Sequence, residues 1–117
     1  MMTSCGYGAL QKYCSIIGCH LADSAWLALE DRAELSFYDF AQAVESHGYT
    51  CQAYYSEEKI PLPCIAYLQR GKFQHYVVLL RYDWLVWYYE PWKGKRVLPR
   101  LLFQQFFTKK VFVVDCF

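Results

Sequence analysis

A cysteine, a histidine and a glutamate lie along this chain in positions where they could carry out covalent acyl transfer. Cys5 directly precedes an apolar stretch with helical spacing, so its thiol is predicted at the first turn of a helix. The unpaired backbone N–H groups and the dipole at that end favour the thiolate over the thiol. Cys5 is therefore a candidate nucleophile, provided that a general base lies within reach.

The candidate base is His75, and Glu90 is the candidate residue that orients it. His75 lies near the start of the strand pattern Phe73–Arg81, and Glu90 ends the pattern Trp84–Glu90. A hairpin that turns about Tyr82–Asp83 would place the two side chains directly opposite each other on one face. A carboxylate there could accept the imidazole N–H and fix the histidine tautomer.

Other residues could fill the same roles. Asp83 and Asp115 are alternative carboxylates for orienting a histidine, whereas His20 and His47 fit the surface or the end of a helix. The residues alone leave these pairings open.

The cysteines are expected to be reduced thiols. An even count could form disulfides, but that pattern is typical of small secreted chains with thin cores, and this chain is rich in large apolar residues. Cys14-x4-Cys19-His20 has no second ligand pair at zinc-binding spacing, so neither a metal ion nor another cofactor is expected. The six cysteines are Cys5, Cys14, Cys19, Cys51, Cys64 and Cys116.

Helices are predicted in the first part of the chain. The first covers Cys5–Ile17, with Ser4 or Thr3 as its N-cap, and a short one covers Ser24–Glu30. A third begins at Ser36, where Asp39 completes a capping box and Leu35 and Phe40 occupy the positions of a hydrophobic staple. Gly48 closes this third helix.

Strands follow after Gly48, separated by proline, glycine or charged turns. They are predicted over Cys51–Tyr55, Cys64–Leu68, Phe73–Arg81, Trp84–Glu90, Arg96–Leu98 and Val111–Asp115. One further short helix is predicted over Pro99–Phe107, with proline in its first turn. Helices first and a mostly antiparallel sheet afterwards predict an α+β fold, formed by residues 1–117 as a single domain.

The composition limits the partners. The net charge is +1, and the short run Lys93–Arg96 is interpreted as a solvated turn, so no nucleic acid is expected. No apolar run approaches the 18 to 20 residues or so that a membrane span needs, and no export signal is visible at the start. We therefore expect a soluble, cytoplasmic protein with no membrane span of its own.

Three motifs resemble those of the bacteriocin-processing cysteine peptidases. Ser4-Cys5-Gly6-x-Gly8-Ala9-Leu10 is similar to their nucleophile motif, His75-Tyr76-Val77-Val78-Leu79 to their histidine strand, and Glu90-Pro91 stands where they have Asp-Pro. These papain-like domains usually form the cytoplasmic N-terminal part of peptide-exporting ABC transporters. The order and spacing of the motifs agree over essentially the whole chain.

The resemblance implies a papain-like fold and cleavage after a Gly-Gly pair at the end of a leader peptide. It makes Cys5 the nucleophile, His75 the base and then the acid, and Glu90 the orienting residue in place of the usual aspartate. An ABC exporter is the partner that it suggests. An inactive peptidase-like module that binds a substrate or a transporter is the alternative, followed by a cysteine-dependent amidase or transferase.

The oxyanion donor is a second departure from the family pattern. The family has a glutamine several residues before the cysteine, and the given chain has four residues there. Such a donor stabilises the transition state by about 2.7–4 kcal/mol. The Cys5 backbone N–H, Gln11 and Gln74 are candidate replacements.

Aromatic residues crowd the two strands that carry His75 and Glu90. Aromatic side chains make up 20% of the chain, which is more than a small core easily hides. Tyr76, Trp87 and Trp92 are the residues expected to bind substrate, as part of a narrow cleft that would admit only glycines beside Cys5.

Overall fold

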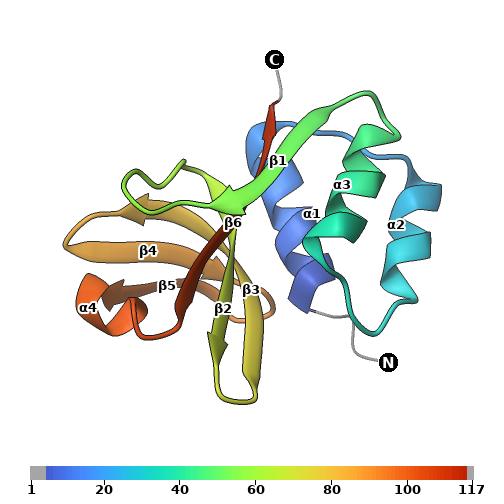
Figure 1. Cartoon of the computed structure of the whole chain (residues 1–117). Helices are drawn as coiled ribbons and strands as arrows, with labels where there is room; N and C mark the ends of the chain where they lie inside the picture. The colour runs from blue at the N-terminus through green and yellow to red at the C-terminus, as the bar shows by residue number, and fades with distance from the viewer. Residues whose placement is uncertain (1–4, 116–117) are drawn as a thin grey trace.

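Helices form where the sequence predicts them in the first part of the chain. The computed structural model describes residues 5–115, and in it α1 (Cys5–Ile17), α2 (Asp23–Glu30) and α3 (Phe37–Glu45) gather on one side of the molecule (Figure 1). The predicted bounds of α1 are confirmed. The proposed N-caps Ser4 and Thr3 lie outside the described residues.

The start of α3 follows the predicted capping box. The Ser36 hydroxyl accepts a bond from the Asp39 backbone N–H, and the Asp39 carboxylate accepts one from the Ser36 N–H at 2.7 Å. Two of the N–H groups left over at the helix start are thereby satisfied. This cap also fixes the loop before α3, which forms one wall of the site described below.

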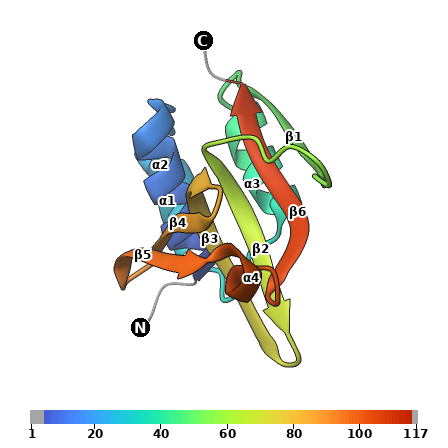
Figure 2. The same ribbon diagram turned by 90° about the vertical axis from the view of Figure 1, so that its left-hand side faces the viewer.

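All six strands pair antiparallel in one sheet, in the order β1-β6-β2-β3-β4-β5. Their bounds are β1 (Thr50–Tyr55), β2 (Cys64–Arg70), β3 (Phe73–Tyr82), β4 (Leu85–Glu90), β5 (Gly94–Pro99) and β6 (Phe107–Asp115). In Figure 2, β5 runs nearly across the direction of β2 and β6, so the sheet is strongly twisted. The α+β fold is confirmed.

The helix predicted over Pro99–Phe107 is shorter than expected. Only Arg100–Phe103 is helical (α4), and β6 begins at Phe107, four residues before the predicted start. Phe107 pairs with Leu68 of β2 and packs against Phe103. The apolar residues after Pro99 favour a helix by their local pattern, but pairing with a distant strand overrides that preference.

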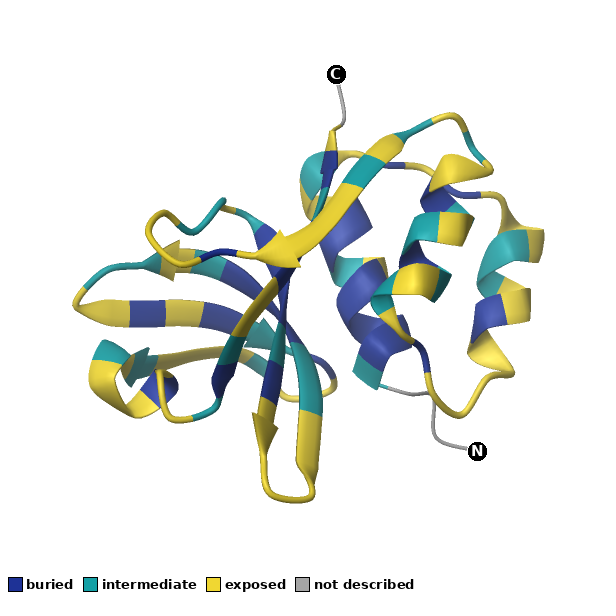
Figure 3. Cartoon of the chain, viewed as in Figure 1, coloured by how far each residue is buried: buried dark blue, intermediate teal, exposed yellow. Residues whose placement is uncertain are grey.

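Two apolar cores lie on opposite faces of the sheet. The first is enclosed by the helices and includes Leu10, Phe40 and Phe112, whereas the second lies under α4 and includes Val77, Val86 and Phe103. Figure 3 shows α1 largely buried and the outer sides of α2 and α3 exposed. None of the helices formed by residues 5–115 has the length and hydropathy of a membrane span.

Candidate active site

The first turn of α1 is packed tightly between two parts of the chain. A Cβ atom at Gly6 would lie 3.1 Å from Leu35 Cβ and 3.5 Å from Tyr76 Cδ2, and one at Gly8 would lie 2.8 Å from Pro91 Cβ. Glycine is needed at Gly8 because real Cβ atoms do not approach so closely. The close approach is therefore made by the protein itself, and it holds the start of α1 against β3 and the turn after β4.

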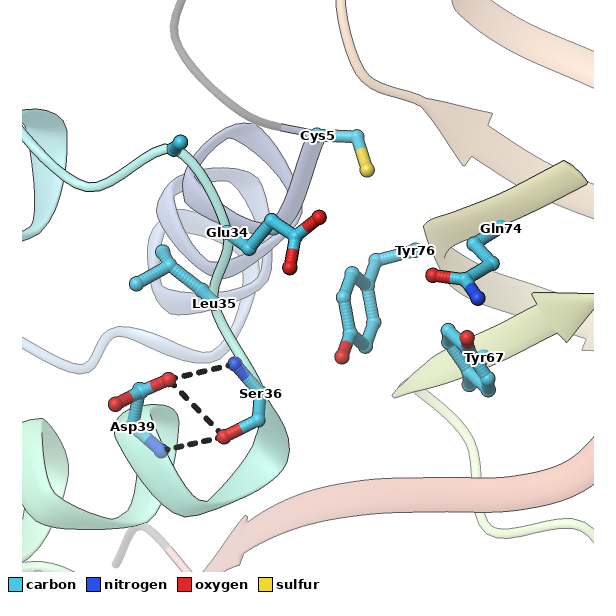
Figure 4. A pocket seen from close by; sticks show the side chains of 10 residues that line it. Cys5, Glu34, Leu35, Ser36, Asp39, Tyr67, Gln74 and Tyr76 are labelled. Atoms are coloured by element: carbon cyan, nitrogen blue, oxygen red, sulfur yellow. Dashed lines mark hydrogen bonds between the residues drawn. The ribbon is translucent and has the colours of Figure 1, made fainter. Parts of the chain in front are cut away.

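Cys5 opens α1 and is half-buried. Its side chain points toward a space bounded by the loop before α3 and by β3 (Figure 4). That space is a pocket of about 470 Å³. It is lined by Cys5, Gly6, Ala33, Glu34, Leu35, Ser36, Asp39, Tyr67, Gln74 and Tyr76. The thiol at the helix N-terminus therefore borders an open pocket large enough for a peptide side chain.

His75 and Glu90 are brought together, and their chain neighbours Tyr76 and Pro91 pack on this first turn of α1. His75 Nε2 lies 3.3 Å from Glu90 Oε1, and both side chains are mostly buried, with 16% and 13% exposed. The ring N–H is not aligned with that oxygen, and Nε2 has no hydrogen-bond partner among the described residues. Catalytic hydrogen bonds often lie poorly aligned until a substrate binds. The distance of 3.3 Å already lies within the range of a hydrogen bond.

The direct pairing predicted for these two residues is wrong. β3 and β4 pair Val78 with Tyr89 and Leu79 with Tyr88, so the same register continued by one residue places Glu90 beside Val77. His75 and Glu90 are diagonal neighbours, two residues apart along β3. The glutamate side chain is long enough to span that diagonal.

A β-bulge determines that the two residues share a face. Beyond Leu79 the register shifts, so that Arg81 pairs with Trp87 and Tyr82 with Val86, which leaves Leu80 as the extra residue. Without the bulge, the register of Tyr82 and Val86 would continue to Glu90 beside Val78, on the face opposite His75. Bulges are common next to active sites because they redirect side chains in this way.

Two further cations surround the Glu90 carboxylate. Lys93 Nζ lies 3.7 Å from Oε1, and Arg96 Nε lies 3.6 Å from Oε2. The pKa of His75 is lowered, first because burial disfavours the charged ring, then because Lys93 repels it, while Glu90 acts in the opposite direction. Lys93 and Arg96 belong to the run that the sequence analysis interpreted as a solvated turn. The spacing of Glu90 and Lys93, three residues apart, was the available signal.

The alternative partners of the histidine lie elsewhere. Asp83 pairs with Arg81 at the turn between β3 and β4, at the other end of these strands from His75. Asp115 accepts a hydrogen bond from Thr50 at 3.4 Å. His47 accepts a bond from the Ala22 N–H at 2.9 Å and so joins α3 to the start of α2. Among the described residues, Glu90 is the carboxylate that contacts His75.

The three aromatic residues expected to bind substrate do not lie at one site. Tyr76 lines the Cys5 pocket and also packs against Phe40. Trp92 is 58% exposed and lies over Gly8 in a different groove of about 230 Å³. Trp87 lies on β4 and lines none of the described pockets around α1. Tyr67, which the sequence analysis did not single out, stands beside Tyr76 in the Cys5 pocket.

The two glutamines considered as oxyanion donors also lie in different pockets. Gln74 lines the Cys5 pocket (Figure 4). Gln11 lies further along α1 and lines the groove that also contains Trp92. No disulfide joins two of the five described cysteines, and Cys116 lies outside the described residues. Within residues 5–115, no three His, Cys, Asp or Glu side chains gather as metal ligands would.

The sequence matches that of a known peptidase family. Residues 3–116 match the sequence model of the peptidase C39 family. No curated protein sequence matches the chain.

Solved structures show the same papain-like fold. A double glycine motif protease from an AMS/PCAT transporter, solved in complex with the leader peptide, superposes with a TM-score of 0.77 at 18% identity, over 97% of this chain and 85% of that one. The N-terminal peptidase C39 like domain of the toxin secretion ATP-binding protein from Vibrio parahaemolyticus gives 0.71 at 22% identity, over 98% of both chains. The peptidase domain of Streptococcus mutans ComA gives 0.70 at 14% identity, over 99% and 95%.

Proposed function

Because this chain belongs to the peptidase C39 family, we propose that it is a cysteine peptidase that cuts leader peptides after a pair of glycines. The observation that carries the proposal is the contact of 3.3 Å between His75 Nε2 and Glu90 Oε1. It is supported by the position of Cys5 at the start of α1, whose first turn packs against Tyr76 and Pro91, the chain neighbours of these two residues. Nucleophile, base and orienting carboxylate are the three groups that thioester chemistry needs.

In this mechanism the Cys5 thiolate attacks the carbonyl carbon of the bond after the second glycine. The resulting C–S bond and oxyanion collapse to a thioester as the C–N bond breaks, and the His75 imidazolium gives its proton to the leaving amine. His75 then takes a proton from water, and the hydroxide formed attacks the thioester. The C–S bond breaks, the leader leaves as a carboxylic acid, and Cys5 is restored.

Glu90 keeps His75 in the orientation that both steps need. Its carboxylate stabilises the imidazolium that forms and holds the tautomer with the proton on Nε2. The Cys5 backbone N–H at the start of α1 and the Gln74 amide are the donors available to the oxyanion.

The structures of the relatives support the substrate and the partner. One is a double glycine motif protease from a transporter, bound to a leader peptide, and another is the peptidase-like domain of a toxin secretion ATP-binding protein. We place the present chain at the cytoplasmic face of the membrane, beside an ABC exporter whose peptide cargo it trims.

Cleavage of a synthetic peptide tests the proposal. A peptide with a leader ending in Gly-Gly is incubated with the protein, and the products are identified by mass spectrometry. We expect one cut after the second glycine, its loss in Cys5→Ala, and its retention in Cys51→Ala, which removes another half-buried thiol. Glu90→Gln should lower kcat by about 10²- to 10⁴-fold.

Alkylation of the thiols gives an independent measurement. Iodoacetamide should modify Cys5 much faster than the other cysteines near neutral pH, because it reacts with the thiolate. Cleavage that persists in Cys5→Ala, or equally slow alkylation of all six cysteines together with no cleavage, would overturn the proposal.

A further inference from the structure

Glu34 brings a negative charge without an ion-pair partner to the Cys5 pocket. Two carboxylates line this pocket, Glu34 and Asp39. Asp39 is already engaged, because its carboxylate accepts bonds from Ser36 and pairs with Arg32 Nη1 at 2.6 Å. Glu34 forms no ion pair with any residue between 5 and 115. Figure 4 shows its carboxylate extending into the space between Cys5 and Tyr76.

The rest of the pocket suits the side chain of a lysine or an arginine. The rings of Tyr67 and Tyr76 form the opposite wall, with centroids 5.1 Å apart, and no Lys or Arg is among the described lining residues. The pKa of Tyr76 is raised to about 12, chiefly by burial, so its hydroxyl stays neutral. An aliphatic stem could lie along the two rings while its cationic end meets the Glu34 carboxylate.

The position of His75 indicates which part of the substrate enters the pocket. Gln74 and Tyr76 line the pocket and point to one face of β3, whereas His75 points to the other face with Val77. The leaving amine must lie next to His75, because it takes its proton from that ring. The pocket therefore lies on the side of the leader and not on the side of the released peptide.

We propose that Glu34 determines specificity by selecting a basic side chain in the leader, a few residues before the glycine pair. The inference rests on the proposed function and narrows its substrate class to leaders that carry a lysine or an arginine there. The glycines would pass Cys5, and the basic side chain would occupy the pocket bounded by Glu34, Tyr67 and Tyr76.

A set of matched peptides tests this selection. Lysine, norleucine or glutamate is placed in turn at the third, fourth and fifth positions before the cut, and kcat/KM is measured at low ionic strength. At one position the wild type should prefer lysine over glutamate by about 3- to 20-fold, as expected for a partly exposed ion pair and the corresponding repulsion. The preference should shrink as salt is added.

Charge variants identify the residue responsible. Glu34→Gln should bring the ratio between the lysine and glutamate peptides close to 1, and Glu34→Lys should reverse it. Glu57→Gln removes an exposed carboxylate from the loop after β1, outside the pocket, and should leave the ratio at the wild-type value. A wild-type ratio near 1 at all three positions would overturn the inference while leaving the proposed function intact.

A binding measurement keeps the inference testable if no peptide is cut. Product peptides that end in Gly-Gly and carry lysine or glutamate at the selected positions are used to protect Cys5 from iodoacetamide. Stronger protection by the lysine peptide in the wild type, lost in Glu34→Gln, would support the inference even if the proposed cleavage failed. Equal protection by both peptides would overturn it.

Discussion

At the scale of single residues, the Glu90 carboxylate contacts three basic side chains of the site. It contacts His75 Nε2, Lys93 Nζ and Arg96 Nε at 3.3, 3.7 and 3.6 Å. The two long cationic side chains are themselves more than half exposed, so each contributes modestly. Together they place two positive charges beside the carboxylate group that faces His75.

The first expectation at this scale concerns the titration of His75. Lys93→Gln removes a cation that opposes protonation of the ring, so the pKa of His75 should rise. Glu90→Gln removes the charge that favours protonation, so the pKa should fall further below its ordinary value. The measurement is a histidine NMR titration in a Cys5→Ala background, which removes coupling to the thiol.

Lys95→Gln is the matched control for this titration, because it removes the same charge from a position in β5, two residues after Lys93. Tyr89, its partner on β4, points to the face opposite Glu90. The His75 pKa should stay at the reference value in this variant. A fall of the pKa in Lys93→Gln would contradict the electrostatic role given to Lys93.

At the scale of elements, α1 carries the nucleophile because glycines allow it to approach its neighbours. The Gly6 contacts fix the helix against the loop before α3 and against β3, and the Gly8 contacts fix it against Pro91 and Trp92. Trp92 itself adopts φ 71°, a left-handed conformation that is uncommon for a bulky residue. The turn that follows Glu90 is therefore shaped around the helix start.

Gly8→Ala should destabilise the fold although alanine favours helices. The added methyl group would lie 2.8 Å from Pro91 Cβ, and such overpacking costs about 1–3 kcal/mol. The gain in helix propensity is about 1 kcal/mol, so we expect a net loss of up to about 2 kcal/mol in the free energy of unfolding. Urea denaturation measures it.

Ser15→Ala provides the comparison, since Ser15 is an exposed residue of the same helix. It should gain a few tenths of a kcal/mol from helix propensity alone. If Gly8→Ala were as stable as Ser15→Ala, the close approach of Pro91 to Gly8 would not be what requires glycine at this position.

The elements that the sequence predicts well are those set by local signals. The bounds of α1 and the capping box of Ser36 and Asp39 follow from residues within a few positions of each other. The register of β3 and β4 does not, because the bulge at Leu80 depends on how both strands pack against the two cores. The site shows the same division. The sequence predicted that His75 and Glu90 meet, although not as diagonal neighbours, whereas Glu34 and Tyr67 come from segments that only the fold brings to Cys5.

At the scale of the whole molecule, a buried tyrosine joins the helical layer to the sheet. The Tyr13 hydroxyl accepts a hydrogen bond from the Val114 N–H at 2.9 Å. β6 pairs Phe112 with Ile65 of β2, and continuing that register would place Val114 opposite Pro63, just beyond the start of β2. The tyrosine therefore takes the place of a strand partner where the ladder has ended.

Tyr13→Phe should cost about 1–3 kcal/mol of unfolding free energy, because it leaves a buried N–H without a partner. Tyr49→Phe is the control: its hydroxyl accepts a bond from the His20 N–H in an exposed position, where water can replace it. We expect a loss of at most about 0.5 kcal/mol there. Equal losses in the two variants, measured by urea denaturation, would show that burial of the Val114 N–H is unimportant.

The bulge at Leu80 also restricts how this hairpin can change in length. Deleting or inserting one residue within β4, with the turn and its pairing with Tyr82 kept, would turn the carboxylate to the helical side of the sheet, away from His75, whereas a change of two residues would return it to the same side. Homologues that keep the histidine and its acid should therefore differ in this segment by even numbers of residues, or carry a second bulge where the number is odd.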